Sequence, residues 1–343
     1  MQAADENPSA KRRKVEAQVT PLVAAVASTK GRKQHLEDVP IVCPSLEGSN
    51  GALSLYAVLD GHGGRQAADW CAARLPALLA EGLTGVNASA AIKEAIRTAF
   101  NQCDAELLEQ CRANSWDDGT CAIALLIDRR CSPPRAYVAN LGDSRAYAAV
   151  LPSADAATSA STAATAIRSV PLSKDHTAVE PKERKRIESS GGFVQNGRVC
   201  GLLEVSRSLG DRKLKKGGEA TRGSSLSIPT PDVTSFAVGP EQSFVLLACD
   251  GLWKVFSGDQ AVEWLHERLP KMDARRVEIA LALEPPAITA LTQQALAALR
   301  AERESANEEG CLRAMLHEAV HVRHAKDNVT CILVRLAEMS DHE

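Results

Sequence analysis

The stretch Val58-Leu59-Asp60-Gly61-His62-Gly63-Gly64 decides how this 343-residue chain is interpreted. It ends the apolar run Leu53 to Leu59, which has the length and composition of a buried strand. A second apolar run, Ser243 to Cys249, ends in the same way at Asp250-Gly251. A buried strand that ends in Asp-Gly fixes a carboxylate in space, and glycine lets the backbone approach a ligand closely. We therefore expect a binding site where these two strands end.

Outward from Asp60, the chain alternates between short apolar runs and helical patterns. Strands are predicted at Leu53–Leu59, Thr120–Ile127, Arg135–Ala139, Arg145–Val150, Ser243–Cys249 and Asn328–Leu336. Helices are predicted at Arg65–Ala80, Ala88–Cys111, Glu180–Ser190, Asp259–Leu269, Ala287–Glu304 and Ala306–His321. The strands between 120 and 150 follow one another without a helix, which indicates hairpins. We therefore expect an α+β fold of antiparallel sheets covered by helices.

Composition and charge argue against several classes of protein. Hydrophobic residues make up 45% of the chain, enough for a substantial core in one large domain or two. The net charge is −3, and the aromatic residues are only four Trp, three Tyr and five Phe. A general nucleic-acid binder would need a basic surface and stacking rings, so no nucleic-acid partner is expected. The apolar runs are far shorter than the roughly 18 residues that span a bilayer, so no membrane partner is expected either. We also predict that the protein is a monomer.

Two motif searches remove other enzyme classes. No G-x-x-x-x-G-K-[ST] loop occurs, and the Gly61–Gly64 run lacks the third glycine of a dinucleotide motif because position 66 is Gln. His317-Glu318-Ala319-Val320-His321 does fit the H-E-x-x-H pattern of zinc proteases. However, the extended form of that motif needs a glycine where His324 stands, and few residues follow. We therefore assign these histidines to the wet face of a helix and do not expect a zinc protease.

Carboxylates recur at the ends of predicted strands beside glycine residues. They are Glu37, Asp38, Asp60, Asp250 and Asp327. A single surface aspartate ordinarily caps a turn or a helix, but several at element ends can converge on one site. Oxygen ligands without Cys or His favour Mg²⁺ or Mn²⁺. The sequence therefore predicts a site that depends on one of these metals.

The chain resembles the metal-dependent Ser/Thr protein phosphatases of type 2C. Matching stretches run in family order from about residue 23 to 336: Glu37-Asp38, Val58–Gly64, Asp118-Gly119-Thr120, Ala139–Ala146, Leu172–His176, Arg186-Ile187 with Gly191-Gly192, Val205–Asp211, Leu247–Trp253 and Asp327–Thr330. Within the family, the segments 202–208 and 252–256 look most like the integrin-linked-kinase-associated branch. The resemblance implies two stacked antiparallel sheets flanked by helices, with a binuclear metal centre at one end.

The resemblance also implies a role for each site residue. Asp60 would bridge two Mg²⁺ or Mn²⁺ ions, Gly61 would offer its carbonyl to one ion, and Asp250 and Asp327 would hold the other. Glu37 and Asp38 would act mostly through metal-bound waters. A hydroxide between the two metals would attack the phosphorus of phosphoserine or phosphothreonine in a protein substrate, without a covalent intermediate. His62 would protonate the leaving alkoxide as general acid, and a structural histidine in the turn is the alternative.

Two positions depart from the family pattern. The usual phosphate-binding arginine is Lys33 here, with Arg32 beside it, so positive charge remains but Lys33 lacks the bidentate fork of an arginine. Lys254 stands where many members have an aspartate that helps to bind a third metal together with the residue equivalent to Asp143. We therefore expect two metals and no third one at this place. The alternative to an active phosphatase is a catalytically silent relative that serves as a binding module.

The expected domain organisation follows from these segments. Residues 1–20 form a disordered basic tail, residues 21–338 form the catalytic domain with insertions near 153–169 and 270–309, and residues 339–343 form a short polar tail. Within the first tail, Lys11-Arg12-Arg13-Lys14 is a candidate nuclear-import signal, which predicts a location in the nucleus and cytoplasm. A solvated cluster of charges is the alternative.

Overall fold

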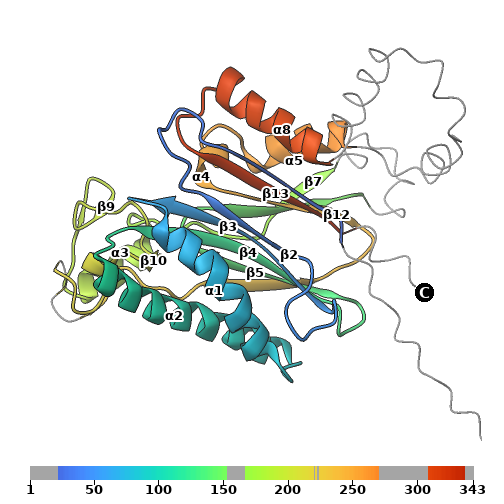
Figure 1. Ribbon diagram of the computed structural model, residues 1–343. Helices are drawn as coiled ribbons and strands as arrows, with labels where there is room; N and C mark the ends of the chain where they lie inside the picture. Colours follow the sequence, from blue (N-terminus) through green and yellow to red (C-terminus); the bar gives the residue numbers. More distant parts are fainter. Residues whose placement is uncertain (1–21, 153–166, 220, 222–223, 270–307, 337–343) are drawn as a thin grey trace, which may run out of the picture.

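Two antiparallel sheets stacked face to face form the centre of the protein (Figure 1). The computed structural model describes residues 22–152, 167–219, 221, 224–269 and 308–336. The first sheet has the order β1 (Ala24–Thr29), β13 (Val329–Arg335), β12 (Gln242–Ala248), β6 (Arg145–Val150), β7 (Arg168–Pro171). The second has the order β11 (Asp232–Ala237), β5 (Arg135–Leu141), β4 (Gly119–Asp128), β3 (Leu53–His62), β2 (Val39–Cys43), with β10 (Leu209–Gly210) paired to β4. The predicted fold class is confirmed.

The core between the sheets follows from side-chain alternation along the strands. Tyr56 and Val58 of β3 point toward the first sheet and pack with Val245 and Leu247 of β12 in one fully buried cluster. The alternate residues of β3, such as Leu55 and Leu59, point to the opposite side. β3 is therefore apolar on both faces, which is why it reads as an uninterrupted hydrophobic run.

Helices cover the outer faces of both sheets (Figure 1). On the second sheet lie α1 (Gln66–Leu83) and α2 (Ser89–Asn114), whose Leu75 and Phe100 pack on the outer side of β3 and β4. On the first sheet lie α5 (Gly258–Arg268) and α8 (Glu308–His317), which continues as the π-helical turn η5 (Glu318–Val322). Each helix packs an apolar stripe against its sheet, so the protein has four layers in the order helices, sheet, sheet, helices.

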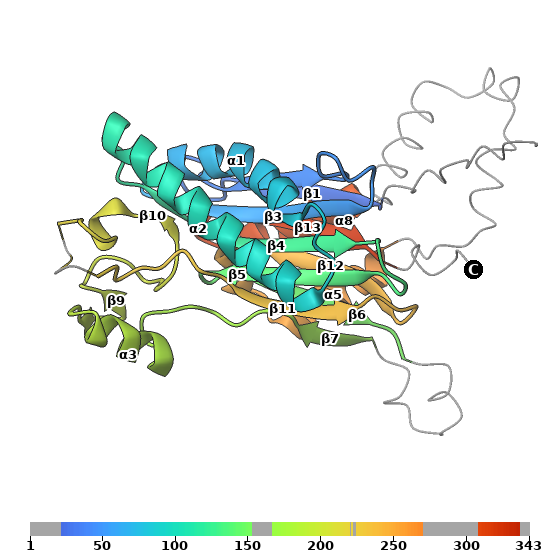
Figure 2. The same cartoon turned by 90° about the horizontal axis from the view of Figure 1, so that it is seen from below.

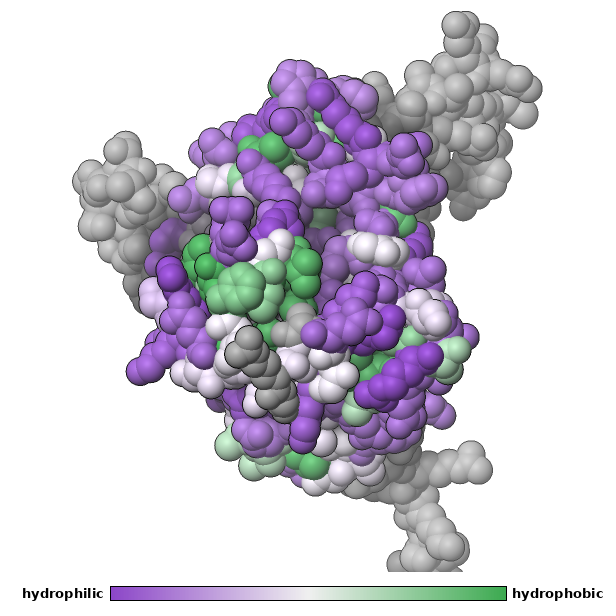
Figure 3. All heavy atoms as spheres, turned by 90° about the vertical axis from the view of Figure 1, so that its left-hand side faces the viewer, coloured by the Kyte–Doolittle hydropathy of each residue, from purple (hydrophilic) through white to green (hydrophobic). Residues whose placement is uncertain are grey.

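A smaller segment stands at the end of the sandwich where β3 ends. It contains α3 (Pro181–Ser189), the two-stranded sheet of β8 (Val194–Gln195) and β9 (Arg198–Val199), and the 3₁₀ turn η3 (Arg212–Leu214). Figure 2 shows α3 and β9 on the side away from α1, and Figure 3 shows an apolar patch on this end face. Val179, Phe193 and Leu202 from this segment are exposed.

Four of the strands that sequence patterns missed, β1, β2, β7 and β11, lie at the edges of the two main sheets. β1 and β7 are the edges of the first sheet, and β11 and β2 are the edges of the second. An edge strand has one neighbour and keeps part of its surface in water, so it lacks the continuous apolar run of a central strand. The predicted central strands all occur, with small differences at their ends.

The remaining predictions concern helices and segments outside the central sheets. The predicted helices at 65–80, 88–111, 180–190 and 259–269 correspond to α1, α2, α3 and α5, and the one at 306–321 corresponds to α8 with η5. The tail 1–20, most of both predicted insertions, the helix predicted at 287–304 and the C-terminal tail lie outside the described residues. Among the described helices, none combines the length and the hydrophobicity that a membrane crossing requires.

Candidate active site

Four chain segments bring carboxylates to one end of the sandwich. Asp60 lies two residues before the end of β3, Asp38 lies directly before β2, and β2 pairs antiparallel with β3. Asp250 begins the short helix α4 (Asp250–Trp253) two residues after the end of β12, and Asp327 lies two residues before β13. Because β3 pairs with β2, and β12 with β13, in antiparallel register, the end of one strand adjoins the start of the next. The segments converge although they are far apart in sequence.

Asp60 is shared by two groups of possible metal ligands. In the first group, ligand atoms of Asp38, Asp60 and Cys249 lie within 4.8 Å of one another, and in the second group the same holds for Asp60, Asp143 and Asp250. A carboxylate has two oxygens, so Asp60 can contribute to both groups at once. The backbone N–H of Asp250 also donates to Asp60 Oδ2 over 3.4 Å. Asp60 is therefore the carboxylate common to both possible ligand groups.

Burial and mutual repulsion make these carboxylates costly to ionise without a cation. Burial, together with the charges of Asp38, Asp250 and Asp143, raises the pKa of Asp60 well above its usual value. Burial also raises the pKa of Asp38 and of Asp143 to about 6, and the charge of Asp250 adds to both shifts. Several acids this close cannot all be charged in a low-dielectric site unless positive charge neutralises them. The group therefore fits one or more divalent cations.

Asp38 is a buried carboxylate whose oxygens lack hydrogen-bond partners among the described residues. It is 1% exposed, and neither carboxylate oxygen has a hydrogen-bond partner of ordinary geometry among the described residues. The Thr330 hydroxyl and the Cys249 thiol lie beside it. A buried carboxylate without partners is strongly unfavourable, and an ion or ion-bound water at this place would satisfy it.

Cys249 belongs to the first group of ligands but does not act there as an anion. Burial and the charges of Asp38 and Asp60 raise the pKa of the Cys249 thiol well above its usual value. A thiol ligates as the thiolate, so the oxygen atoms of the aspartates remain the suitable ligands. This set favours hard cations such as Mg²⁺ and Mn²⁺.

The loop before β2 is fixed against the site by close backbone contacts. A Cβ atom at Gly61 would lie 2.5 Å from the carbonyl oxygen of Glu37, so only glycine fits here. The side chain of Asn328 accepts from the Glu37 N–H over 2.9 Å and donates to the carbonyls of Lys30 and His35 over 3.0 and 2.9 Å. Asn328 thus joins the start of β13 to the loop that carries Glu37 and Asp38.

Two lysines partly neutralise the other side of the carboxylate cluster. Lys254 Nζ contacts the carboxylate of Asp250 and lies 3.4 Å from Asp327 Oδ2, and Lys33 Nζ lies 3.0 Å from Asp327 Oδ1. Burial acts to raise the pKa of Asp327, but the hydrogen bond from Lys33 and the nearby charges outweigh it, so the pKa falls below its usual value. The charges of Asp250 and Asp327 in turn raise the pKa of Lys254 despite its partial burial.

His62 is held by a carboxylate that the sequence did not reveal. Its Nε2 lies 2.9 and 3.0 Å from the two carboxylate oxygens of Asp211, which directly precedes η3. Burial acts to lower the pKa of His62, but the charge and hydrogen bond of Asp211, with Asp143 and Glu37, raise it above the usual value. The Ser208 hydroxyl donates to Asp211 over 2.5 Å and meets the Ser227 hydroxyl at 2.8 Å. Asp211 therefore favours the protonated form of His62.

The predicted site residues fall into three sets in the structure. Asp38, Asp60 and Asp250 lie within the two ligand groups, and Glu37 and Gly61 adjoin them through the backbone. Asp327 joins the cluster through Lys254. Lys33 and Arg32 lie on the same loop, where Arg32 Nη2 donates to His324 Nδ1 over 3.2 Å. Sequence analysis assigned no role to Asp211 or Asn328, although the quoted motifs 205–211 and 327–330 contain them.

Comparisons with known proteins identify the family of the chain. The model of the family Protein phosphatase 2C matches residues 23–295. The probable protein phosphatase 2C 67 of Oryza sativa subsp. japonica is 33% identical over 323 residues, 92% of this chain and 76% of that protein. The integrin-linked kinase-associated serine/threonine phosphatase 2C of Homo sapiens is 30% identical over 324 residues, 91% of this chain and 71% of that protein.

Solved structures give the same result for the fold. The crystal structure of a phosphatase from a pathogenic strain of Toxoplasma gondii has a TM-score of 0.66 at 19% identity and covers 94% of this chain and 95% of its own. A serine-threonine phosphatase 2C from Toxoplasma gondii has a TM-score of 0.61 at 22% identity, with coverage of 92% and 96%. The family itself is established by the match to the family model and by the identity to the Oryza sativa and Homo sapiens proteins. The chain belongs to the protein phosphatase 2C family of metal-dependent serine/threonine phosphatases.

Proposed function

We propose that this chain hydrolyses phosphoserine and phosphothreonine in proteins at the carboxylate cluster around Asp60, with two Mg²⁺ or Mn²⁺ ions as cofactors. The observation that carries the proposal is that Asp60 belongs to two ligand groups at once. Asp60 would bridge the ions, Gly61 would serve one of them, Asp250 and Asp327 would serve the other, and Glu37 would act through metal-bound water. Asp38 would act through water, which agrees with its unpartnered oxygens.

Bound divalent ions would supply positive charge against the phosphoryl oxygens and would acidify an attacking water. The protein's own part is to hold the carboxylates in place, to bind the phosphate and to move a proton. His62 is partly exposed at the end of β3, and Asp211 favours its protonated form, so it suits the general acid that protonates the leaving Ser or Thr oxygen. Lys33 and Arg32 supply positive charge on the adjoining loop for the phosphate.

A complete ligand set supports activity over a silent binding module. Every predicted carboxylate is present, and the structure brings most of them into one cluster whose charges repel one another. Such repulsion lowers stability unless a cation binds, so a module that needed no metal would gain from losing one of these charges. The second function considered above therefore has less support.

The test is phosphate release from a phosphothreonine peptide by the full chain, with Mn²⁺ and then with a chelator. We expect turnover with Mn²⁺ and none with the chelator, and Asp60→Asn should nearly abolish turnover because an amide cannot neutralise two dications. A matched control is Asp69→Asn, which removes an exposed carboxylate of α1 that pairs with Arg65. Equal turnover by wild type and Asp60→Asn, or turnover in chelator, would contradict the proposal.

We also propose that the basic run Lys11 to Lys14 directs part of the protein to the nucleus, the remainder staying in the cytoplasm. The run is short, basic and set in a polar segment, which is the pattern of an import signal. Deletion of residues 1–17 should leave catalysis intact and reduce nuclear accumulation of a fluorescent fusion. Unchanged localisation would make the run a solvated charge cluster.

A further inference from the structure

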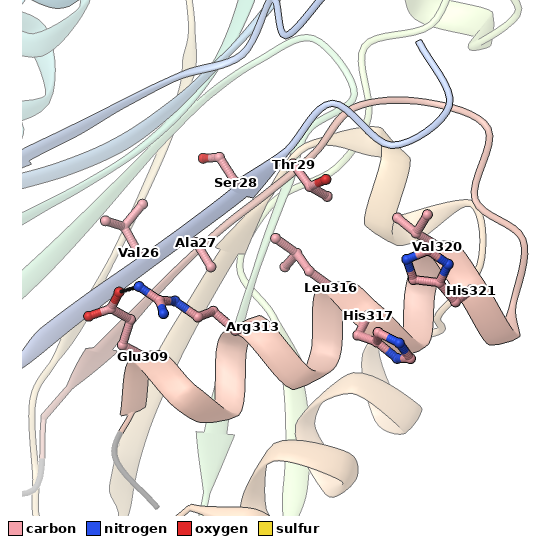
Figure 4. Close-up of a pocket in the computed structure, with 10 residues that line it drawn as sticks. All are labelled: Val26, Ala27, Ser28, Thr29, Glu309, Arg313, Leu316, His317, Val320 and His321. Carbon is pink, nitrogen blue, oxygen red and sulfur yellow. Dashed lines mark hydrogen bonds and ion pairs between the residues drawn. The ribbon is translucent and has the colours of Figure 1, made fainter. Parts of the chain in front are cut away.

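A surface groove lies between α8 and the edge strand β1, on the outer side of the first sheet (Figure 4). Its volume is about 360 Å³. One wall is the backbone and side chains of Val26–Thr29, and the other wall is formed by α8 and η5. The groove is lined by His317 and His321, the two histidines of the H-E-x-x-H motif that the phosphatase function leaves unused.

Two imidazoles lie next to each other on the wall of this groove. His317 and His321 are four residues apart, and their ring centroids are 4.6 Å apart with the planes tilted by 37°. Figure 4 shows both rings beside the groove. Both residues are exposed, and among the described residues neither ring has a hydrogen-bond or ion-pair partner. The ring nitrogens are therefore free to bind a ligand.

The acidic side chains near the two histidines form ion pairs with arginines and are not available as ligands. The carboxylate of Glu309 pairs with Arg313 on the groove wall, and Glu318 pairs with Arg323 over 3.2 Å. Glu318 therefore does not serve as the catalytic base that the zinc-protease motif requires. What remains of the motif is a pair of nitrogen donors one helical turn apart, which is the spacing at which two histidines on one helix face bind zinc.

The backbone has an unusual conformation at the two histidines. The α-helix changes to a π-helical turn at Glu318, between the two histidines. π-Helical turns are rare, and they occur frequently at functional sites. The turn is packed on the first sheet through Ala319 and Val320, so the backbone that carries His321 is fixed although its ring is exposed.

We propose that His317 and His321 form a second metal site, which binds one transition-metal dication such as Zn²⁺ through two imidazole nitrogens. Imidazole suits Zn²⁺, Cu²⁺ and Ni²⁺, whereas carboxylate and carbonyl oxygens suit Mg²⁺ and Mn²⁺. The two sites therefore select different metals. Water in the open groove would complete the coordination shell of the ion.

The experiment is a titration of Zn²⁺ into the full chain in saturating Mg²⁺, followed by calorimetry and by the imidazole signals in NMR spectra. We expect the signals of His317 and His321 to shift together as the first equivalent is added. His317→Gln and His321→Gln should each weaken this binding by at least about tenfold, since even the loss of a residue that only supports a ligand costs about 10–100-fold. His266→Gln, on α5, is the matched control and should leave the binding unchanged.

Two outcomes would overturn the proposal. One is an identical Zn²⁺ isotherm for wild type and both variants, which would place the binding elsewhere, for example at an exposed thiol such as Cys131. The other is a wild-type spectrum in which the His317 and His321 signals do not move at one equivalent of Zn²⁺. Because both side chains are exposed, the variants should fold normally, and the NMR result stands without any variant.

Discussion

Replacing Lys254 by Met should tighten Mn²⁺ binding at the active site. In the structure the Lys254 ammonium contacts the carboxylate of Asp250 and lies 3.4 Å from Asp327, so it already occupies the oxygens that would hold an ion. A dication at those oxygens must either tolerate a positive charge close by or displace it. Lys254 would thus act as a tethered cation that competes with a metal ion at these oxygens.

The size of the effect follows from the exposure of the lysine. Two unit charges about 4 Å apart interact by about 1 kcal/mol in water and about 4 kcal/mol at an effective dielectric constant of 20. The Lys254 side chain is 52% exposed, so it can swing into solvent and lose only its ion pairs, at about 1 kcal/mol or less each. We therefore expect a gain of about 1.4 kcal/mol, which is about tenfold in the dissociation constant.

The assay is equilibrium Mn²⁺ binding to the purified chain, with free Mn²⁺ measured by electron paramagnetic resonance. Lys93→Met, on the outer helix α2, removes the same charge away from the site and should leave the affinity unchanged. Equal or weaker binding by Lys254→Met would refute the reasoning. Lys254→Asp should go further and add a weak third Mn²⁺ site with Asp143, and a wild-type chain that already binds Mn²⁺ through Asp143 in a third site would contradict our interpretation of Lys254.

Three further predictions concern the proton donor and the phosphate contacts. His62→Gln should slow hydrolysis of a phosphoserine peptide by about 10²–10⁴-fold but slow an aryl phosphate much less, because phenoxide leaves without a proton; equal losses would remove His62 from this role. Asp211→Asn should lower the pKa of His62, since a carboxylate that favours the protonated ring is lost, so the descending limb of the pH profile of kcat should move to lower pH; an unmoved limb would contradict the contact. Lys33→Ala should mainly raise KM, and Lys33→Arg should be tolerated; an unchanged KM would assign the phosphate contact to Arg32.

Sequence patterns predicted the centre of the fold better than its edges, for a physical reason. β3 and β4 are buried on both faces and therefore appear as apolar runs. β1, β2, β7 and β11 each have one neighbouring strand and keep polar or half-exposed positions, so their signal is weak. β2 even contains Pro40, and proline within a sheet is confined to edge strands, the first residue of a strand or bulges.

Some residues of the site were also predictable from local sequence, and others were not. Asp60 and Asp250 were predictable because each ends an apolar run with Asp-Gly, a local signal. The contact of His62 with Asp211 joins residues 149 positions apart, and the pairing of Lys254 with Asp327 joins residues 73 apart. Such contacts depend on how the strands are ordered in space, which no short window of sequence contains. The motif 205–211 located Asp211 but not its partner.

The central claim is that Asp60 is shared between two metal ions. It is tested most directly by anomalous scattering from crystals of the wild-type chain soaked in Mn²⁺. We predict two Mn²⁺ ions in the cluster, each with a carboxylate oxygen of Asp60 as a ligand. A single ion, or two ions of which one does not contact Asp60, would contradict the account.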